Sequence, residues 1–334
     1  MRTKPTTYQD QLVTTIGGGT GTYPVVAALR TLCNHLTCIV AVSDSGGSSA
    51  RLRDEFGFPP VGDLRQSLTA LANPTSQHLL QQLLLYRFDK GRELKGHNLG
   101  NLILTALQDM TGTTTQALET AAQLFQFHGR VIPITEDSVN LKVFYRDGTS
   151  IIGEHLLDEV DAPLKPIRKI ALIPKPKTNP QALEILSQSD HLIIGPGDLF
   201  ASLEAVLVAP KVSKIIQNSN AKITYIVNIM TRRSQTAGMS ATDHVAEIEK
   251  VIKRSITNIV INNRSPKSEQ LAPYQLVDEY PVVDDLGNDR RVIRAPLLTY
   301  TPTKQSASDV VPRSVLRHNS NQLQKVLRRI LKNQ

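Results

Sequence analysis

Short apolar runs alternate along this chain with segments of helical periodicity, and this alternation limits the fold more than any other feature. Strand-like runs occur at LVTTI (12–16), TCIVAV (37–42), HLIIG (191–195), KITYIVNIM (222–230) and TNIVIN (257–262). Strands that alternate with helices are typical of a parallel sheet covered by helices on both faces. Since such crossovers are right-handed, the sequence predicts an α/β fold with a three-layer, doubly wound, mostly parallel, Rossmann-like sheet.

The periodicity changes from helical to alternating between residues 130 and 173. The runs VNLKVFY (139–145) and TSIIGEHLL (149–157) flank Asp147-Gly148, and Asp-Gly is a strong hairpin signal. We therefore expect an antiparallel β-hairpin insertion at about residues 130–173 of a single Rossmann-like domain that covers residues 1–334. Near the C-terminus, apolar residues at helical spacing predict a basic helix at about 318–332. This helix could lie on an anionic membrane, but docking on its own domain is the favoured interpretation.

Composition excludes several classes of protein. No apolar run approaches the roughly 20 residues of a membrane span, and no signal-peptide core precedes the first glycines, so a cytoplasmic location is expected. Cys33 and Cys38 are too few for a disulfide framework; they could be zinc ligands with His35, but two buried thiols are favoured and no metal site is assigned. The net charge of +8 suggests an anionic partner, yet with 4% aromatic residues and no tryptophan we expect no nucleic acid.

The segment GGGTGT (17–22) follows the first predicted strand. Glycines there let successive backbone N–H groups face a phosphate at the positive end of the next helix. The dinucleotide fingerprint fails because Thr22 stands where a glycine is required, and the P-loop pattern lacks its lysine. A tight turn without a ligand is the alternative interpretation. The candidate anion ligands are Gly18, Gly19, Thr20 and Gly21.

The segment DSGGSSARLR (44–53) follows the second predicted strand. Its glycines could form a second anion site, and its arginines match phosphate or carboxylate geometry. Asp44 could accept a ribose hydroxyl, hold a metal, take a proton, or simply cap the turn. The candidate ligand-binding residues of this segment are Asp44, Ser45, Gly46, Gly47, Arg51 and Arg53.

Two later loops repeat the same pattern. GPGDLFAS (195–202) and the loop at the end of KITYIVNIM add Gly195, Gly197, Asp198 and Asn228 to the candidates. The carboxyl ends of parallel strands share one edge, where open α/β sheets bind their ligands. Four such loops therefore predict a pocket for an anionic, phosphorylated ligand. Asp63 in GDLR adds a carboxylate. Asn98 and Asn101 in GHNLGNL fall on one helical face, where their amides could read the sugar or base of a ligand, and Asn228 is expected to read its nucleoside or sugar.

These motifs, in this order, resemble the gluconeogenesis factor proteins of bacteria and their relative 2-phospho-L-lactate transferase. The matching segments are GGGTGT, DSGGSSARLR, GDLR, GHNLGNL, GPGDLFAS and NIMTRRSQTAG followed by Asp243-His244. The resemblance implies a Rossmann-like core with its ligand at the strand ends. In the first branch it implies binding of UDP-N-acetylglucosamine and related UDP-sugars, and support of cell shape and wall synthesis on gluconeogenic carbon sources, with no settled catalytic reaction.

The resemblance also implies which residues contact the ligand, and it shows where this sequence differs from the family pattern. Tyr274 and Arg317 match positions that meet the sugar nucleotide in the factor branch, whereas Asn319 replaces the acid that often follows the Arg-His pair. The segment NIMTRRSQTAG departs from the more usual NxMTQPGET. The predicted protein is thus a UDP-sugar-binding regulator that requires no cofactor. Homo-oligomers and further protein partners are left open.

The transferase branch implies an alternative function. Its members move a phospholactyl group from a guanosine diphosphate carrier to a deazaflavin, using magnesium. On that reading the candidate catalytic residues are Asp44 and Asp63, which would hold Mg²⁺ beside the phosphates.

Overall fold

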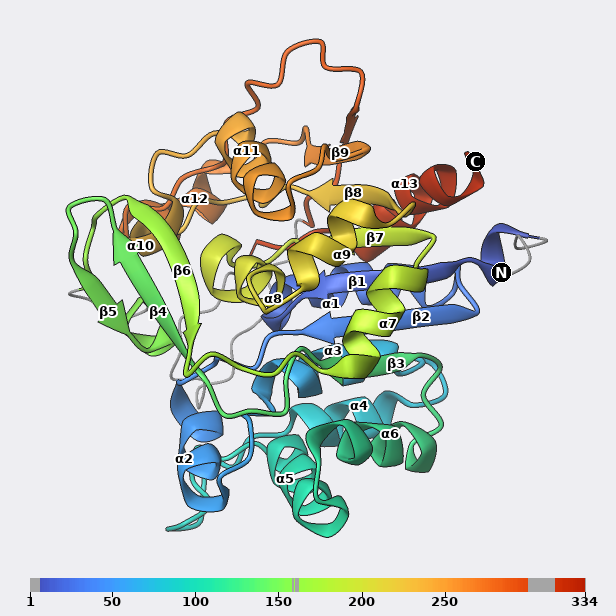
Figure 1. The fold of residues 1–334 in the computed structure, drawn as a ribbon, viewed down its shortest axis with the longest axis vertical. Helices are drawn as coiled ribbons and strands as arrows, with labels where there is room; N and C mark the ends of the chain where they lie inside the picture. Colours follow the sequence, from blue (N-terminus) through green and yellow to red (C-terminus); the bar gives the residue numbers. More distant parts are fainter. Residues whose placement is uncertain (1–6, 158, 160–161, 300–315, 334) are drawn as a thin grey trace.

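The computed structural model describes residues 7–157, 159, 162–299 and 316–333, and its main sheet has seven parallel strands (Figure 1). Their spatial order is β10-β9-β8-β7-β1-β2-β3, and each neighbouring pair is parallel. The predicted doubly wound parallel sheet is confirmed. The strands are β1 (Leu12–Gly17), β2 (His35–Val40), β3 (Arg130–Pro133), β7 (His191–Ile194), β8 (Lys222–Ile226), β9 (Asn258–Asn262) and β10 (Val292–Ala295).

The order in which the chain builds this sheet creates one topological switch point. From β1 the chain adds β2 and β3 on one side; it then returns to place β7 on the other side of β1 and continues outward through β8, β9 and β10. The connections after β1 and β7 therefore leave the sheet in opposite directions. A crevice opens at the carboxyl ends of these two strands, which is where ligands bind in sheets of this type.

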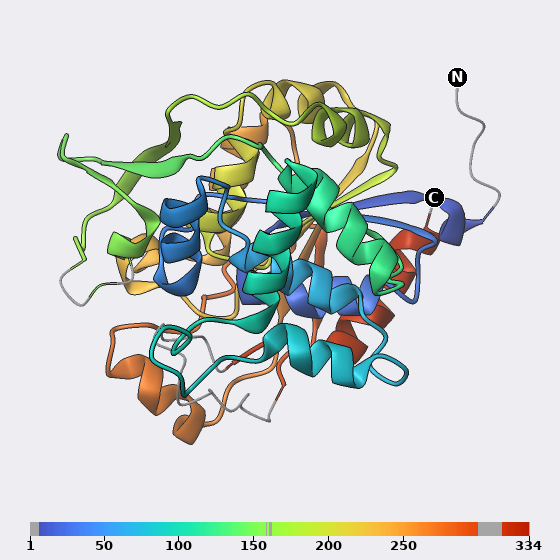
Figure 2. The same ribbon diagram turned by 90° about the horizontal axis from the view of Figure 1, so that it is seen from below.

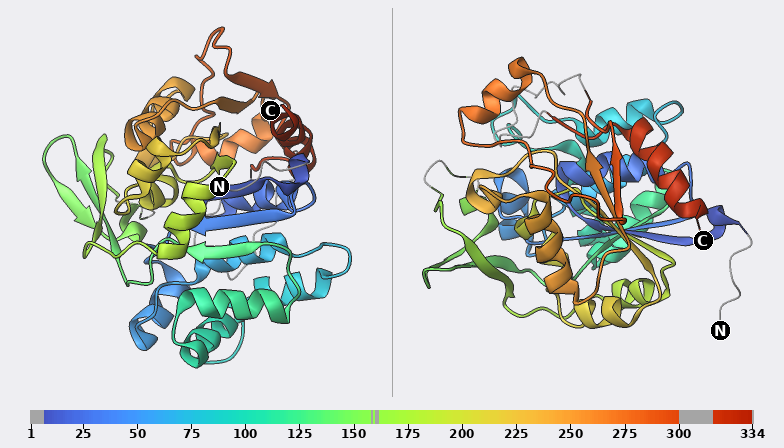
Figure 3. Two further views of the ribbon diagram at one scale, coloured as in Figure 1. Left: turned by 45° about the vertical axis from the view of Figure 1, so that its right-hand side comes forward. Right: turned by 90° about the horizontal axis from the view of Figure 1, so that it is seen from above.

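Helices cover both faces of the sheet (Figures 2 and 3). On one face α1 lies between α3 and α13, and on the other face α9 lies between α7 and α11. The helices are α1 (Gly19–Leu29), α2 (Gly47–Phe56), α3 (Gly62–Leu71), α4 (His78–Leu85), α5 (Leu99–Thr111), α6 (Thr114–Leu124), α7 (Pro180–Gln188), α8 (Ala205–Leu207), α9 (Val212–Asn218), α10 (Arg233–Thr236), α11 (Ala241–Ile252), α12 (Ser268–Gln275) and α13 (Ser320–Lys332). Three short helical segments are labelled separately: η1 (Tyr8–Asp10), η2 (Glu154–Leu157) and the π-helical η3 (Leu199–Glu204).

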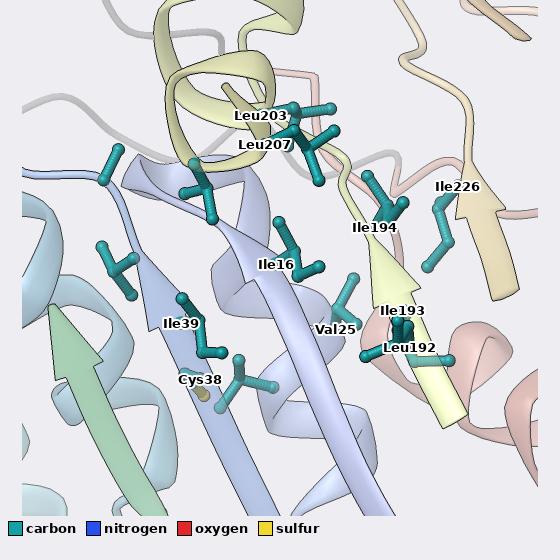
Figure 4. Packing of buried hydrophobic residues seen from close by; sticks show 14 of the residues in the cluster. Ile16, Val25, Cys38, Ile39, Leu192, Ile193, Ile194, Leu203, Leu207 and Ile226 are labelled. Carbon is teal, nitrogen blue, oxygen red and sulfur yellow. The ribbon is translucent and has the colours of Figure 1, made fainter. Parts of the chain in front are cut away.

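The core lies between the sheet and these two layers. Successive residues Leu192, Ile193 and Ile194 of β7 are all fully buried, so both faces of the strand pack against apolar neighbours (Figure 4). This explains why the strands have continuous apolar sequences rather than alternating ones. Each such side chain contributes about 1.5–3 kcal/mol of burial free energy, which holds the strand ends in fixed positions.

A separate three-stranded antiparallel sheet projects from the carboxyl edge of the main sheet (Figure 1). It consists of β4 (Asn140–Tyr145), β5 (Ser150–Ile152) and β6 (Ile167–Ile173), in the order β5-β4-β6. We call β4, β5, η2 and β6 together the insertion. The predicted hairpin at Asp147-Gly148 joins β4 to β5. The predicted start at residue 130 needs correction, because Arg130–Pro133 pairs in parallel with β2 and belongs to the main sheet.

The C-terminal helix α13 docks its apolar face on the protein. Leu323, Leu327 and Leu331 are fully buried, and the Gln324 side chain donates a hydrogen bond to the Thr31 hydroxyl beside α1 at 2.6 Å. The apolar stripe is thus used in packing, as the favoured interpretation expected. Within the described part of the chain, no helix combines the length and apolarity that crossing a membrane requires.

Candidate functional site

A cavity lies at the switch point between β1 and β7. Three of the four predicted loops line it, namely those after β1, β7 and β8, and a segment close to the C-terminus completes the wall. The described lining residues are Gly18, Gly19, Thr20, Gly21, Pro24, Pro196, Gly197, Asp198, Ser202, Asn228, Ile229, Met230, Thr231, Arg232, Glu279, Leu316, Arg317 and His318.

The loop after β1 presents backbone N–H groups to this cavity. Helix α1 begins at Gly19, so Gly19, Thr20 and Gly21 form its first turn, whose N–H groups have no acceptor inside the helix. Gly19 adopts a left-handed φ of 64°. A Cβ on Gly21 would lie 2.7 Å from the Pro196 carbonyl oxygen. The glycines therefore let the positive end of α1 approach the next loop closely, which creates a site for an anion.

The loop after β7 is held in place by the loop after β8. The Asn228 side chain donates to the Gly197 carbonyl at 2.9 Å and accepts from the Gly197 N–H at 3.3 Å. Gly195, with a φ of 71°, turns the chain at the strand end. Asn228 lines the cavity as predicted from the sequence, but its carboxamide is already bonded to this backbone. Its prediction as a reader of the nucleoside or sugar remains a prediction.

An arginine between two acids forms the charged side of the cavity. Arg232 Nε lies 3.5 Å from Asp198 Oδ1, and its Nη1 lies 3.4 Å from Glu279 Oε1. Asp198 belongs to the predicted site residues. Arg232 stands in the fourth predicted loop, two residues after a predicted strand, but was not assigned a contact with the ligand, and Glu279 was not predicted. Glu279 stands in no recognisable motif and reaches the site only through tertiary packing.

The C-terminal segment 316–318 forms another wall of the cavity. The Leu316 N–H donates to the Tyr274 hydroxyl at 2.7 Å, and Tyr274 packs with Met230 and Leu316 in a small apolar cluster. Arg317 lines the cavity, as expected for a residue that meets the ligand. Tyr274 is not among the described lining residues. In this structure it supports the segment that carries Arg317.

His318 is a buried neutral histidine in the same wall. Burial lowers its pKa to about 4, although a hydrogen bond with the Val227 backbone acts in the opposite direction. Its Nε2 has no hydrogen-bond partner in the described part of the chain. The next residue, Asn319, caps α13 by accepting a hydrogen bond from the Gln322 N–H at 3.1 Å. Asn and Asp cap helices equally well, so the departure from an acid at this position preserves the local structure.

The fourth predicted loop, after β2, lies beside the cavity without being part of the described lining. The Gly46 N–H donates to Asp44 Oδ1 at 2.8 Å, and Gly47 begins α2. A Cβ on Gly62 would lie 3.0 Å from Asp44 Oδ2, and one on Gly18 would collide with the Asp63 carboxylate. The start of α3 therefore lies between the β2 loop and the glycine loop, and brings both candidate carboxylates to the same region.

Two more predicted residues, Arg53 and Arg51, lie away from the described lining. Arg53 donates to Asn140 Oδ1 of β4 at 3.1 Å and pairs with Asp54. The Arg51 guanidinium lies close to Gly96, 3.3 Å from where a Cβ would stand.

Asn98 has a structural role in this structure, and its predicted contact with a ligand stays a prediction. It is buried and caps α5 by accepting from the Asn101 N–H at 3.1 Å. Asn101 accepts from Arg65 Nε at 2.7 Å, so both amides that were expected to read a ligand are hydrogen-bonded inside the protein.

The described residues contain no cluster of three or more acids, histidines or cysteines arranged to hold a metal. Cys33 and Cys38 are free and buried, and burial raises the pKa of each thiol to about 12. Zinc ligation requires thiolates, so the favoured interpretation of two buried thiols agrees with the structure. Asp44 and Asp63 remain a predicted pair for magnesium, which binds proteins through one or two carboxylates together with substrate phosphates.

Comparison with known proteins gives similarity over most of the chain. The family model of 2-phospho-L-lactate transferase CofD matches residues 13–298. The gluconeogenesis factor of Bacillus subtilis is 32% identical over 97% of this chain and 99% of that protein. A relative from Nostoc sp. is 35% identical over 96% of this chain and 68% of its own length. A crystal structure of a Bacillus halodurans protein superposes with a TM-score of 0.84 at 30% identity, covering 95% of this chain and 99% of the other.

Proposed function

Because the chain belongs to the 2-phospho-L-lactate transferase CofD family, within which it is similar to gluconeogenesis factors over nearly their whole length, we propose that it binds UDP-N-acetylglucosamine or a related UDP-sugar. In this role it is a cytoplasmic regulator that supports cell shape and wall synthesis during gluconeogenic growth. Binding, rather than turnover, is the activity that we propose.

The observation that carries this proposal is the cavity at the switch point, formed by the first turn of α1 and by Gly197. A diphosphate has several acceptor oxygens and no donors, which complements a set of backbone N–H groups at the positive end of a helix. The other walls can hold the rest of the ligand. Ile229, Met230 and Leu316 provide apolar surface, whereas Arg232 and Glu279 provide polar groups.

Different residues of the cavity bind different parts of the ligand. The N–H groups of Gly19, Thr20 and Gly21 bind the diphosphate, and Arg317 contributes a positive charge from the wall formed by residues 316–318. Asp198 and Glu279 already balance Arg232. We therefore assign the uncharged part of the ligand to that side, where ligand hydroxyls can donate to the two carboxylates.

Isothermal titration calorimetry with UDP-N-acetylglucosamine tests the proposal. Saturable heat at micromolar ligand, reproduced in part by UDP alone and absent with N-acetylglucosamine alone, is expected because the diphosphate is the anchor. Absence of heat at millimolar ligand would contradict it. The variant His128→Ala is the control, because His128 is exposed just before β3, at the amino ends of the strands and away from the cavity.

A second function has a specific observation in its favour. Asp63 lies against Gly18 and Asp44 lies against Gly62, so two carboxylates stand close to the proposed phosphate site. Bound Mg²⁺ would neutralise phosphate charge there during transfer of a phospho group from a nucleoside-diphosphate-linked donor. The glycine-loop N–H groups would meet the developing charge. Magnesium-dependent turnover of a guanosine-diphosphate-linked donor, lost in Asp63→Asn, is the result that would favour this function.

A further inference from the structure

The turn η2 of the insertion is bonded to two loops that belong to different halves of the main sheet. Ser45, in the loop after β2, is paired with His155 of η2: its hydroxyl lies 2.8 Å from His155 Nδ1 and accepts from the His155 backbone N–H at 3.1 Å. Ser234, in α10 after β8, donates its hydroxyl proton to the Leu157 carbonyl at 2.6 Å. Two residues of one four-residue turn, His155 and Leu157, thus contact both loops.

The two loops that η2 contacts lie on either side of the switch point. In the main sheet β2 and β8 are separated by β1 and β7, the two strands of the switch point. The loops after β1, β7 and β8 line the cavity, and the loop after β2 adjoins it through the start of α3. Figure 1 shows the insertion on the side of the molecule to which the parallel strands point. The turn η2 therefore connects the two flanks of the cavity.

The serine side chains in these contacts are buried, whereas the His155 side chain is exposed. Ser45 and Ser234 are 8% and 7% exposed, so breaking either hydrogen bond would leave a buried hydroxyl without its partner. The His155 side chain also packs near Gly46 and Gly153, whose missing side chains make room for it. At the other end of the insertion, Asn140 of β4 accepts from Arg53 of α2. The insertion is thus bonded to the β2 loop, to the helix after it, and to α10.

From this geometry we propose that η2 couples the cavity to the insertion, with His155 as the positioning residue that holds the Ser45 loop. When a diphosphate fixes the loops around the cavity, η2 loses freedom and the insertion becomes more ordered. Coupling between two sites is reciprocal, so loosening η2 is expected to weaken binding of the ligand, at most by the coupling factor. The identity of the ligand rests on the proposed function, whereas the connection between the two loops does not.

Two variants of His155 test the coupling. His155→Ala removes the side-chain contact and is expected to weaken UDP binding by roughly 5- to 20-fold, within the usual range of coupling between sites. His155→Asn places a polar atom near the position of Nδ1 and is expected to keep the affinity within about twofold of the wild type. His128→Ala is the matched control. Wild-type UDP affinity in His155→Ala would overturn the proposal.

Hydrogen exchange followed by mass spectrometry supplies a readout that a merely structural role would not move. With saturating UDP, the peptide covering residues 150–157 should exchange more slowly in the wild type and show a smaller change in His155→Ala. Unchanged exchange of this peptide on UDP binding would overturn the coupling.

The same experiment without ligand separates this proposal from the proposed function. His155→Ala should accelerate exchange in the peptide of α10, residues 233–236, through the loosened Leu157 contact. If UDP fails to bind the wild type, the proposed function fails, but the ligand-free experiment still tests the connection between the two loops. Faster exchange of α10 in His155→Ala supports that connection, and unchanged exchange overturns it.

Discussion

The loops after β1 and β2 have similar sequences and different surroundings. Both follow an apolar strand, both contain consecutive glycines and hydroxyl residues, and both lead directly into a helix. The β1 loop lines the cavity with its backbone and packs against the β7 loop. The β2 loop instead bonds to itself through Asp44, and to the insertion through Ser45.

This difference shows what a glycine-rich loop does and does not determine. Glycines permit a close approach of backbone, but the neighbouring strand decides what is approached. Next to β1 is β7, whose loop turns in the opposite direction and leaves a crevice. Next to β2 is β3, after which the chain continues into the insertion. We therefore propose that the β1 loop contacts the ligand and that the β2 loop supports the site. The following predictions challenge that division.

Replacing Gly21 by Val should have the largest effect. The new side chain would meet the Pro196 carbonyl oxygen and the Gly197 Cα, so the β1 and β7 loops would have to separate. We expect UDP-N-acetylglucosamine affinity to fall by about 100-fold or more, equivalent to about 2.7 kcal/mol. Calorimetry measures the affinity, and circular dichroism checks that the fold is kept. A folded variant with wild-type affinity would remove the β1 loop from the binding site.

His318 should make stability depend on pH. Its folded-state pKa of about 4 lies below the ordinary 6.5, so the unfolded chain binds the proton more readily. Stability is therefore lost as the pH falls from about 6.5 towards 4, and the loss at pH 5 relative to pH 7 is about 2 kcal/mol from this group.

Urea unfolding at pH 7 and pH 5 measures this effect. His318→Gln should reduce the difference in unfolding free energy between the two pH values, and the exposed His128→Gln should leave it unchanged. His191 has a similarly lowered pKa, so the His318→Gln variant keeps part of the pH dependence of stability. An undiminished difference in His318→Gln would show that His318 ionises normally in the folded protein.

Arg317→Ala should have an intermediate effect on the ligand. Arg317 lines the cavity, and a charge-assisted hydrogen bond contributes about 1.5–3 kcal/mol. We expect roughly tenfold weaker binding, with a smaller salt dependence of affinity than in the wild type. Titrations at two salt concentrations measure both quantities, and equal salt dependence in the two proteins would count against contact with phosphate.

Asp44→Asn should have the smallest effect. The substitution keeps an oxygen that can accept from the Gly46 N–H, so the β2 loop retains its shape. We expect UDP affinity within about fivefold of the wild type, with or without magnesium. A large loss confined to magnesium-containing buffer would instead move Asp44 into direct contact with a metal, and would favour the transferase alternative.

The sequence predicted the fold and the edge of the sheet that holds the site, because both depend on local signals. Apolar runs mark the buried strands, and the glycines of GGGTGT and GPGDLFAS mark loops that approach one another closely. The boundary of the insertion was misplaced, since RVIP at 130–133 is an apolar run that nothing local assigns to one sheet or the other.

The remaining details of the site depend on partners that are distant in sequence. Nothing near Glu279 indicates that it will meet Arg232. Asn98 has the side chain of a ligand reader, but its position before α5 makes it a helix cap. The contact of Tyr274 with the ligand stays a prediction, and no local signal indicated that its hydroxyl accepts from the Leu316 N–H, 42 residues further along the chain.

A crystal structure of the complex with UDP-N-acetylglucosamine tests the central claim most directly. We predict that the diphosphate oxygens lie within hydrogen-bonding distance of the backbone N–H groups of Gly19, Thr20 and Gly21, with Arg317 on the opposite side. A sugar nucleotide bound with its diphosphate elsewhere, while this cavity holds only solvent, would contradict the account.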